Sequence, residues 1–540
     1  MSVIIRELSR FKNYFYENRL TFMVTFIGGL LVHIYKFLNT IIGHDSLYNF
    51  YSSQNMIGSG RYLLGIFCSP TSFFNLPWVN GIASVLLISL SAVLIVDILH
   101  IDNKLLASLT GLILVTFPAI TETFFFEFTA DGYMWAMLLC TLSVKLTLIK
   151  EKAAPSGIVA SIFLIAITCA IYQAYVSFSL LLLIVYFIND VFSEKRASKK
   201  YLKWILLQLF IYVSALILYL VVWKALMFCL GMTSTSYYGI NSMGSTFSVV
   251  EAVKAVIYNT FIFLFQWNIF EYGLTMYSFI NILTVICICT VFIISVVRSR
   301  IYKNIVNLIL VIGAFFLIPF SASVWCLANP SLVYSPRMYQ SMALVYILLL
   351  VLSSKDIKRY FKTLITVLMM VFVFNNAITA NLYYYYMNLS NDRAKYTATE
   401  LSTRIHLLDD GDVKYIMIVG SLPDFESSEY LDNSRLRSLG ALNNEVDRNL
   451  LSDNNSIYLF MSYYYDFSLA FYTENNVDLP QIGKFESNFP STNDYAYHFP
   501  YIRYSDLSDK QRDDIQNMRI WPHKDSVKKS GDVIIVKLSE

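Results

Sequence analysis

The chain has 540 residues, of which 56% are hydrophobic and 16% aromatic, and its mean hydropathy of +0.53 is far above that of a soluble domain. This composition excludes a soluble globular enzyme and indicates a polytopic membrane protein without a nucleic-acid partner. The net charge of +3 is unevenly distributed. Residues 1–387 hold 25 Lys and Arg against 14 Asp and Glu, whereas residues 388–540 hold 16 against 24. We therefore predict a domain boundary after Met387.

Apolar runs of spanning length recur through the first domain. A helix needs about 20 apolar residues to cross roughly 30 Å of hydrocarbon. The first run is longer than the apolar region of a signal peptide, so it is predicted to be an anchor that follows the short segment 1–20. We predict about eleven spans within residues 21–387, near 21–42, 77–99, 105–121, 133–149, 156–171, 174–190, 204–230, 277–297, 305–327, 338–353 and 363–386.

The basic residues between these spans predict the orientation. Nineteen Lys and Arg residues fall on one side of the predicted spans, whereas Arg61, Lys254 and Arg337 fall on the other. Lys and Arg in short loops mark the cytoplasmic side of a membrane. We therefore expect a multi-pass protein of a bacterial cytoplasmic membrane, with segment 1–20 cytoplasmic and residues 388–540 exported.

The exported tail, residues 388–540, is predicted to be an α/β domain. Its first part, Asp392–Leu408, has apolar residues at helical spacing, and β-like runs follow at residues 413–419, 456–462 and 532–538. The tail lacks a Gly-rich phosphate loop and the common hydrolase motifs. All seven cysteines lie in or beside the predicted spans, and the sequence has no Cys/His framework for a metal.

Acidic residues on the outer side are the first candidates for chemistry. They are Asp45, Glu122, Glu127, Asp131, Glu251 and Glu271. Carboxylates among Phe residues at a bilayer face are costly unless a cavity, a partner or a ligand compensates them. Any one of them could simply be a hydrated loop residue. Asp45 is the strongest candidate for a general base because it directly follows the first span.

Two arginines on the same side suit a phosphate. Arg337 follows Pro336, which stiffens its approach to a late span, and Arg61 follows Gly58-Ser59-Gly60, where glycines allow the backbone close to a ligand. Guanidinium groups bind phosphate through two parallel hydrogen bonds. The alternative for both residues is anchoring to lipid head groups.

The chain resembles the bacterial serotype-converting glucosyltransferases in the order of five short features. These are Asp45 after the first span, Gly60-Arg61-Tyr62 in the same loop, the acids of the second outer loop, Pro336-Arg337, and Asn391-Asp392-Arg393-Ala394 at the start of the tail. The resemblance implies a multispan type C enzyme that moves a hexose, glucose or a related sugar, from a polyprenyl-phosphate donor. The acceptor would be a cell-surface polysaccharide or glycolipid.

The resemblance also implies roles for individual residues. Transfer would be inverting, with Asp45 as general base and with Glu127 and Asp131 as reserve catalytic carboxylates. Arg61, Arg337 and Lys254 would bind the donor phosphate, and His44, Tyr62 and Tyr334 would contact the substrates. No nucleotide or other cofactor and no metal are expected, although the pair Glu127 and Asp131 is compatible with a divalent ion.

Two other functions stay open from the sequence. A polysaccharide polymerase or ligase is also a many-span, outward-acting enzyme, but its large outer loop would be expected between late spans. A lipid-linked sugar flippase or transporter would favour internal repeats and charges near the membrane midplane. The sequence has no evident repeat, and its intramembrane charges Lys36, Asp97, Lys145 and Lys224 lie mostly toward span ends.

Overall fold

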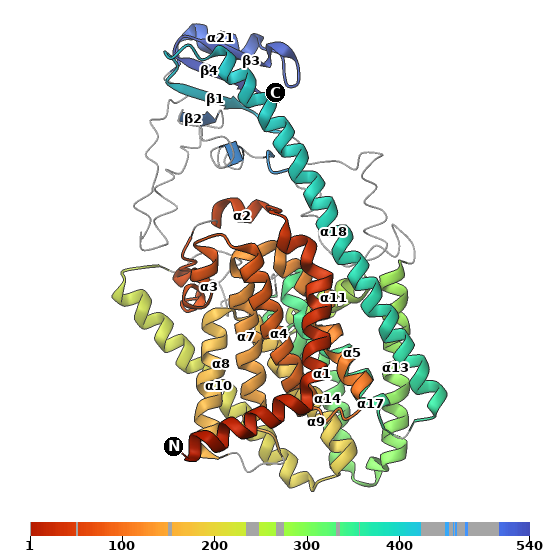
Figure 1. Cartoon of the computed structure of the whole chain (residues 1–540). Coiled ribbons are helices and arrows are strands. Elements are labelled where there is room, and N and C mark those ends of the chain that lie inside the picture. Colours follow the sequence, from red (N-terminus) through yellow and green to blue (C-terminus); the bar gives the residue numbers. More distant parts are fainter. Residues whose placement is uncertain are drawn as a thin grey trace. The chain divides into compact units, whose positions relative to one another are not determined.

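The chain divides into two compact units. The described part of the first, the bundle unit, lies within Met1–Thr40 and Tyr51–Leu382, and the second, the α/β unit, comprises Ile41–Phe50, Tyr383–Asn433 and Asn444–Glu540. The computed structural model (Figure 1) describes residues 2–49, 52–149, 154–233, 248–265, 275–330, 335–355, 357–422, 449–452, 457, 460–461, 470–473 and 507–539.

The bundle unit is built almost entirely of helices. Within the described residues, eight helical stretches are long and apolar enough to cross a membrane, and α8 and α14 are shorter apolar helices. The prediction of a polytopic helical membrane protein is therefore confirmed. The main helices are α1 (Ser2–Leu38), α4 (Pro77–Ile98), α5 (Lys104–Thr116), α7 (Glu127–Leu146), α8 (Pro155–Ile171), α9 (Tyr175–Glu194), α10 (Ser198–Cys229), α11 (Val249–Phe265), α13 (Met276–Ser299), α14 (Ile305–Phe316), α17 (Ala343–Ser353) and α18 (Arg359–Leu408).

Each predicted span contains one of these helices, but two of the predicted spans are interrupted by proline. The span expected at 105–121 ends as α5 at Thr116, because Phe117, which precedes Pro118, is extended with φ −60° and ψ 139°. The chain continues as short helix α6 (Pro118–Thr123). The span expected at 305–327 ends as α14 at Phe316, and Pro319 lies in the first turn of α15 (Ile318–Ala322). The short helix α16 (Val324–Ala328) follows α15.

Helix α11 was not predicted. Glu251 and Lys254 interrupt its apolar run and led to its assignment as part of an outer loop. In the structure these two residues form an exposed ion pair of 2.8 Å one turn apart on the helix. The opposite face, with Val256 and Phe263 buried, packs into the bundle, and Tyr339 donates a hydrogen bond of 3.0 Å to the carbonyl of Asn259.

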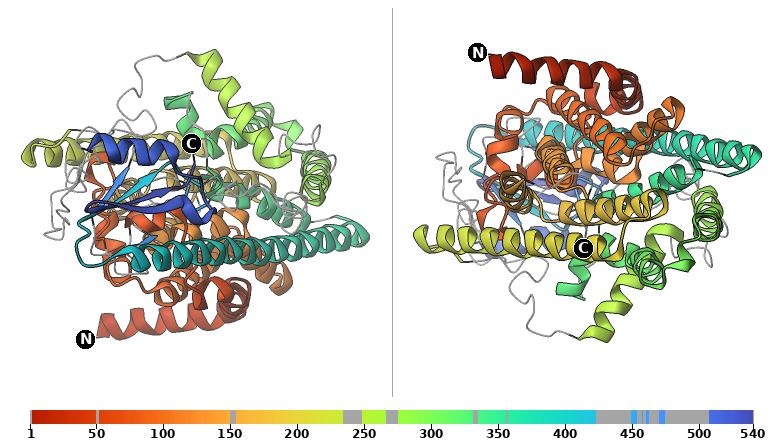
Figure 2. Two further views of the ribbon diagram at one scale, coloured as in Figure 1. Left: turned by 90° about the horizontal axis from the view of Figure 1, so that it is seen from above. Right: turned by 90° about the horizontal axis from the view of Figure 1, so that it is seen from below.

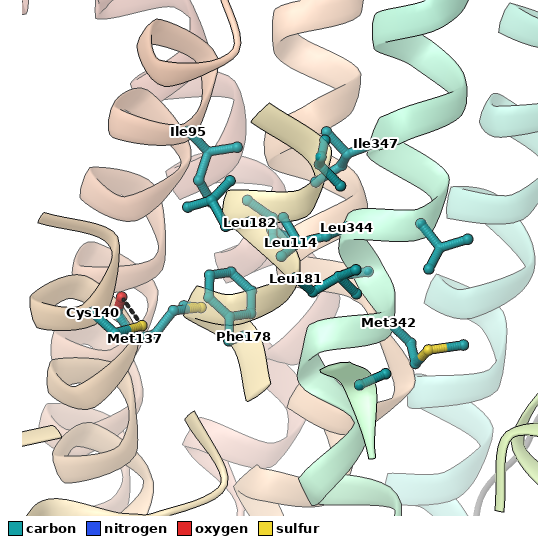
Figure 3. Close-up of a cluster of buried hydrophobic side chains, with 14 of the residues drawn as sticks. Ile95, Leu114, Met137, Cys140, Phe178, Leu181, Leu182, Met342, Leu344 and Ile347 are labelled. Carbon is teal, nitrogen blue, oxygen red and sulfur yellow. Dashed lines mark hydrogen bonds between the residues drawn. The ribbon is translucent and has the colours of Figure 1, made fainter. Parts of the chain in front are cut away.

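The core of the bundle unit lies among helices α4, α5, α7, α9 and α17 (Figure 3). Ile95, Leu114, Met137, Leu181 and Ile347, one from each helix, are all fully buried. Helix association in lipid depends on close van der Waals packing, because the lipid tails are as apolar as leucine. These side chains therefore determine how the helices that carry the outer loops are placed.

The α/β unit contains a four-stranded sheet between two helices. The strand order is β2 (Ala470–Thr473), β1 (Tyr415–Val419), β4 (Val533–Lys537), β3 (Val527–Ser530), with β1 parallel to β2 and β4 and with β3 antiparallel to β4. Alternate residues of β1 and β4 face α18 on one side and α21 (Asp509–Asn517) on the other. The β3–β4 turn contains Gly531 at φ 67°, a left-handed conformation that favours glycine.

Helix α18 joins the two units as one uninterrupted helix of 50 residues (Figures 1 and 2). The predicted last span and the predicted tail helix are therefore the two halves of one element. No Gly or Pro occurs between Arg359 and Leu408 to end the helix. The strand expected at 456–462 is also wrong where the structure describes it. Ile457, Phe460 and Met461 are helical, and their spacing gives a helix one buried face.

Candidate active site

Arg61 lies in a tight loop between α1 and short helix α3 (Leu64–Ser72). The turn η1 (Ile57–Ser59) is followed by Gly60 at φ 79°, and the backbone N–H of Arg61 donates to the carbonyl of Met56 at 3.0 Å. Only glycine adopts the conformation of Gly60 without strain. The loop therefore reverses sharply just before Arg61 and fixes the direction in which its side chain leaves the backbone.

Side chains from distant helices hold this loop. The indole of Trp223 on α10 donates to the carbonyl of Ile57 at 2.8 Å. The amide of Gln173 donates to the carbonyl of Ser59 and to the hydroxyl of Tyr219, both at 3.0 Å. These bonds tie the loop to helix α10 and to the turn that contains Gln173. The Arg61 loop is thus a preformed part of the bundle unit.

The guanidinium group of Arg61 lies against two stacked tyrosines. Its carbon is 4.7 Å from the ring centroid of Tyr172, and Nη1 donates to the hydroxyl of Tyr133 at 3.3 Å. The rings of Tyr133 and Tyr172 stack with centroids 4.1 Å apart. The Nε atom of Arg61 is buried and has no hydrogen-bond partner among the described residues. Its neighbours are neutral, so they do not neutralise the charge.

Arg337 lies near the same tyrosine, although it is distant from Tyr172 in the sequence. It lies in η5 (Pro336–Met342), its guanidinium carbon is 3.5 Å from the ring centroid of Phe126, and its charge interacts electrostatically with Tyr172. Tyr172 therefore lies close to both arginines that were predicted to bind phosphate.

Glu127 and Asp131 lie one turn apart at the start of α7 and are 6% and 4% exposed. Glu127 forms a buried ion pair with Lys36 of α1, although its Oε1 atom has no hydrogen-bond partner among the described residues. Asp131 accepts hydrogen bonds from the hydroxyl of Thr71 at 2.7 Å and from the backbone N–H of Gly132 at 2.9 Å. The protein itself therefore engages both carboxylates.

An asparagine and a phenylalanine connect these carboxylates to their surroundings. Asn80 on α4 donates to the carbonyl of Glu127 and accepts from the backbone N–H of Asp131 at 3.2 Å, which ties the first turn of α7 to α4. Phe126, whose ring lies against Arg337, directly precedes Glu127. The start of α7 thus supports the arginine site as well as the two acids.

Asp45 belongs to the α/β unit rather than to the bundle unit. It lies in the first turn of α2 (His44–Asn49), is half-buried, and its carbonyl accepts a hydrogen bond of 2.8 Å from Asn49. Asn391 of α18 binds both backbone groups of Ile42, just before α2. The side chain of His44 lies outside the described residues.

The other predicted substrate residues have different surroundings. Tyr62 stacks on Tyr219 with centroids 5.8 Å apart, and burial raises its pKa to about 12, so it keeps its proton at neutral pH and can donate a hydrogen bond. Lys254, which was also predicted to bind the phosphate, is 68% exposed and pairs with Glu251 on its own helix. Tyr334 lies outside the described residues. In the described part of the chain, no three His, Cys, Asp or Glu side chains are grouped as a metal site.

Sequence reasoning missed Tyr133, Tyr172 and Gln173 and did not find the partner of Lys36. Tyr172 and Gln173 alone separate two predicted spans, so a polar and aromatic pair in so short a turn was a usable signal. Lys36 was another, because a cation inside a span generally has an anionic partner. Tyr133 carried no signal, since it lies among other aromatic residues on an apolar helix.

A comparison with known protein families finds one family model that covers most of this region. The family model described as Glucosyl transferase GtrII matches residues 34–348. The matched range includes α2, the Arg61 loop, the start of α7 and Arg337. No curated protein and no solved structure matches the chain.

The buried pair of Lys36 and Glu127 predicts a specific pattern of stability. Lys36→Met should lower the free energy of unfolding by about 3–5 kcal/mol, because it leaves a buried carboxylate uncompensated. The double variant Lys36→Met/Glu127→Gln should recover most of this loss. Thermal unfolding of the purified protein in detergent measures both.

The matched control breaks a more exposed pair. Lys145 and Asp97 are 2.9 Å apart, with side chains 27% and 24% exposed, so Lys145→Met should cost about 1 kcal/mol or less. Equal losses for Lys36→Met and Lys145→Met would contradict the assignment of a buried, structurally required pair.

Proposed function

The chain belongs to the GtrII glucosyl transferase family, and from this premise we propose that it moves a glucosyl or related hexosyl group from a polyprenyl-phosphate donor to a cell-surface polysaccharide or glycolipid. Transfer takes place on the outer side of the cytoplasmic membrane and inverts the anomeric carbon. Family membership makes the chain a glycosyltransferase, and the flippase or transporter alternative is therefore set aside.

The proposed phosphate-containing donor rests on the surroundings of Arg61. Within the described residues, its guanidinium contacts only neutral groups, and its Nε is buried without a hydrogen-bond partner. Arg61 is half-buried, and a cation that is partly removed from water without a counterion favours the binding of an anion. A phosphate supplies both the negative charge and acceptor oxygens in the geometry of a guanidinium fork.

The second arginine fits the same ligand. The charge of Arg337 interacts electrostatically with Tyr172, and Arg61 lies over the ring of that tyrosine, so both cations are near enough to one side chain to bind a single phosphate. When the glycosidic bond breaks, negative charge grows on the leaving phosphate. Preorganised guanidinium groups stabilise that charge more strongly than the charge of the bound donor, which lowers the barrier.

Asp45 acts as the general base in this proposal. It removes the proton from an acceptor hydroxyl, the hydroxyl oxygen attacks the anomeric carbon from the face opposite the phosphate, and the bond from that carbon to the phosphate oxygen breaks. The polyprenyl phosphate leaves with the electron pair of the broken bond. A single displacement of this kind inverts the configuration of the sugar.

Glu127 and Asp131 have supporting roles. Both oxygens of Asp131 accept hydrogen bonds from the protein, and Glu127 is held by Lys36, so each helps to fix the start of α7 beneath Phe126 and Arg337. They remain the reserve candidates for the base. Tyr62, which stays protonated, offers a hydroxyl to the sugar or the phosphate.

The orientation follows from basic residues gathered at one end of the bundle unit. The turns that follow α9 and α13 are joined by hydrogen bonds from Asn307 to the carbonyl of Arg196 at 3.0 Å and between Ser198 and Asn304. Lys355, after α17, donates to the carbonyl of Asn189 at 3.0 Å. Three lysine- and arginine-rich turns thus share one end, which we assign to the cytoplasm.

The phosphate role of the arginines predicts a loss of donor affinity. Arg61→Ala and Arg337→Ala should each weaken donor binding by roughly 10- to 150-fold, because each removes a charge-assisted hydrogen bond worth about 1.5–3 kcal/mol. Lysine at either position should rescue poorly, since it keeps the charge but loses the fork. Binding of a labelled polyprenyl-phosphate sugar measures the effect.

Lys254→Ala is the control for this series. Lys254 was expected to bind the donor phosphate, but its charge is exposed and paired, so its removal should change affinity less than about threefold. Unchanged affinity in both arginine variants would identify the two residues as structural or lipid-anchoring groups instead.

The base role of Asp45 predicts a loss of turnover with donor binding retained. Asp45→Asn should lower turnover by roughly 10²- to 10⁴-fold, because the amide cannot take a proton. Membranes containing the protein are supplied with a panel of radiolabelled polyprenyl-phosphate sugars, and label is measured in surface polymer. A panel that labels no polymer with the unaltered protein would rule out the proposed donor class.

If Asp45 is not the general base, two further variants identify the carboxylate that is. If Asp45 only caps α2, Asn caps about as well and activity survives. Glu127→Gln and Asp131→Asn, assayed in the same membranes, would then show which carboxylate is required. Near-normal turnover of Asp45→Asn together with a severe defect in one of these two reassigns the role.

The proposed orientation predicts which exposed positions react with an impermeant maleimide in intact cells. Leu407, at the end of α18, is 81% exposed and Lys199 is exposed at the start of α10. Leu407→Cys should react and Lys199→Cys should not, in a background where the exposed Cys229 and Cys289 are replaced. Reaction only at position 199 would invert the topology.

A further inference from the structure

The segment that carries Asp45 is held by one side chain from the far end of the chain. Asn391 is 1% exposed, its Oδ1 accepts from the backbone N–H of Ile42 at 2.9 Å, and its Nδ2 donates to the carbonyl of the same residue at 2.9 Å. The amide thus pairs with Ile42 as a neighbouring β-strand would. Nδ2 also donates to the carbonyl of Met387 at 3.0 Å, one turn earlier on α18, which orients the amide.

Apolar contacts hold the same segment on both sides of Asp45. Ile42 and Leu47 are buried, at 0% and 8% exposure, in a cluster with Ala394, Ala398 and Leu401 of α18. The cluster continues into β1 and β4. Residues 41–50 are therefore part of the core of the α/β unit, although they follow the first span in the sequence.

Helix α2 cannot hold Asp45 in place by itself. It has six residues, and isolated helices shorter than about 12 residues are marginal in water. Its first turn begins directly after the clamped backbone of Ile42 and Gly43. Contacts with α18 therefore help to place the Asp45 segment, and among the described residues the two-point bond from Asn391 fixes the direction of its backbone.

We propose that Asn391 is a positioning residue for Asp45, so that the α/β unit is a working part of the transferase rather than an appendage. The inference rests on the proposed role of Asp45 as general base. A misplacement of about 1 Å at a reacting group can cost about 10²-fold in rate. Loss of the clamp therefore lowers turnover while donor binding, which depends on residues of the bundle unit, stays the same.

Two substitutions and one control test the clamp. Asn391→Leu keeps the branched shape of the side chain and removes both bonds to Ile42, and it should lower kcat by roughly 10²-fold with the donor KM unchanged. Asn391→Asp keeps an acceptor for the Ile42 N–H and loses the donor, so its kcat should be intermediate. Asn388→Ala, one turn earlier on α18, removes only a bond of 3.3 Å to Asp392 and should leave kcat unchanged.

A second measurement does not depend on catalysis. Ser46, next to Asp45, is fully buried, so Ser46→Cys in a background without the exposed cysteines should react slowly with a maleimide. Adding Asn391→Leu or Asn391→Asp should speed this reaction at least about tenfold, because the buried segment opens more often once it is unclamped. Adding Asn388→Ala should not change the rate. The thermal unfolding temperature of each variant shows whether the α/β unit is still folded.

The two measurements separate the inference from the proposed function. Faster labelling at position 46 with a selective loss of kcat supports the positioning role. Unchanged labelling, or unchanged kcat in a folded Asn391→Leu variant, overturns it. If Asp45→Asn is fully active while Asn391→Leu still speeds labelling, then the proposed base is wrong and the clamp is only structural. An equal loss of kcat in Asn388→Ala would also overturn the inference.

Discussion

Charges inside an apolar helical bundle must be compensated, and the bundle unit depends on this constraint. Lys36 is paired with Glu127, Asp97 with Lys145, and the buried Asp190 receives a two-point contact from Arg196 at 2.9 and 3.2 Å. Each pair joins two helices or closes a turn at a helix end. The pairs therefore spare the cost of isolated charge and also settle which helices lie next to one another.

Arg61 differs from these paired residues, because its guanidinium has only neutral neighbours among the described residues. Its loop is fixed by hydrogen bonds from Trp223 and Gln173, and its guanidinium rests on aromatic rings. Such a firmly held cation with only neutral neighbours among the described residues supports the proposed binding of the donor phosphate. A structural arginine in the same place would be expected to carry a permanent carboxylate partner, as Arg196 does.

Sequence patterns predicted the class of fold because the relevant signals are local. Run length shows the spans, and the helical spacing of Ala394, Ala398, Leu401 and Ile405 predicts the buried face of α18, where all four are buried. Proline explains where two predicted spans are interrupted. Whether a proline ends a helix within a long apolar run depends on the local backbone geometry, here that of Phe117. The run at 456–462 is short, and short apolar runs suit strand and helix equally.

The candidate site was only partly predictable because its partners are distant in the sequence. Arg61 and Arg337 were identified by residue type and neighbours, but Tyr172, which joins them, is an ordinary aromatic residue beside a span. Asp45 was placed in an outer loop, and nothing near it in the sequence points to Asn391. Lys254 has the same charge as the two arginines, yet Glu251 one turn away already provides its counterion.

The contact between Ile42 and Asn391 also has a consequence for the order of biosynthesis. These residues are 349 positions apart, and at about 5–20 residues per second the second is made roughly 17–70 s after the first. During that interval the ribosome delivers the helices of the bundle unit from α3 to α17, while the early segment lacks the core into which it packs. A chain released before α18 is complete would contain the Arg61 loop but would lack the residues against which the Asp45 segment packs. With Asp45 as the proposed base, such a truncated product is expected to be inactive.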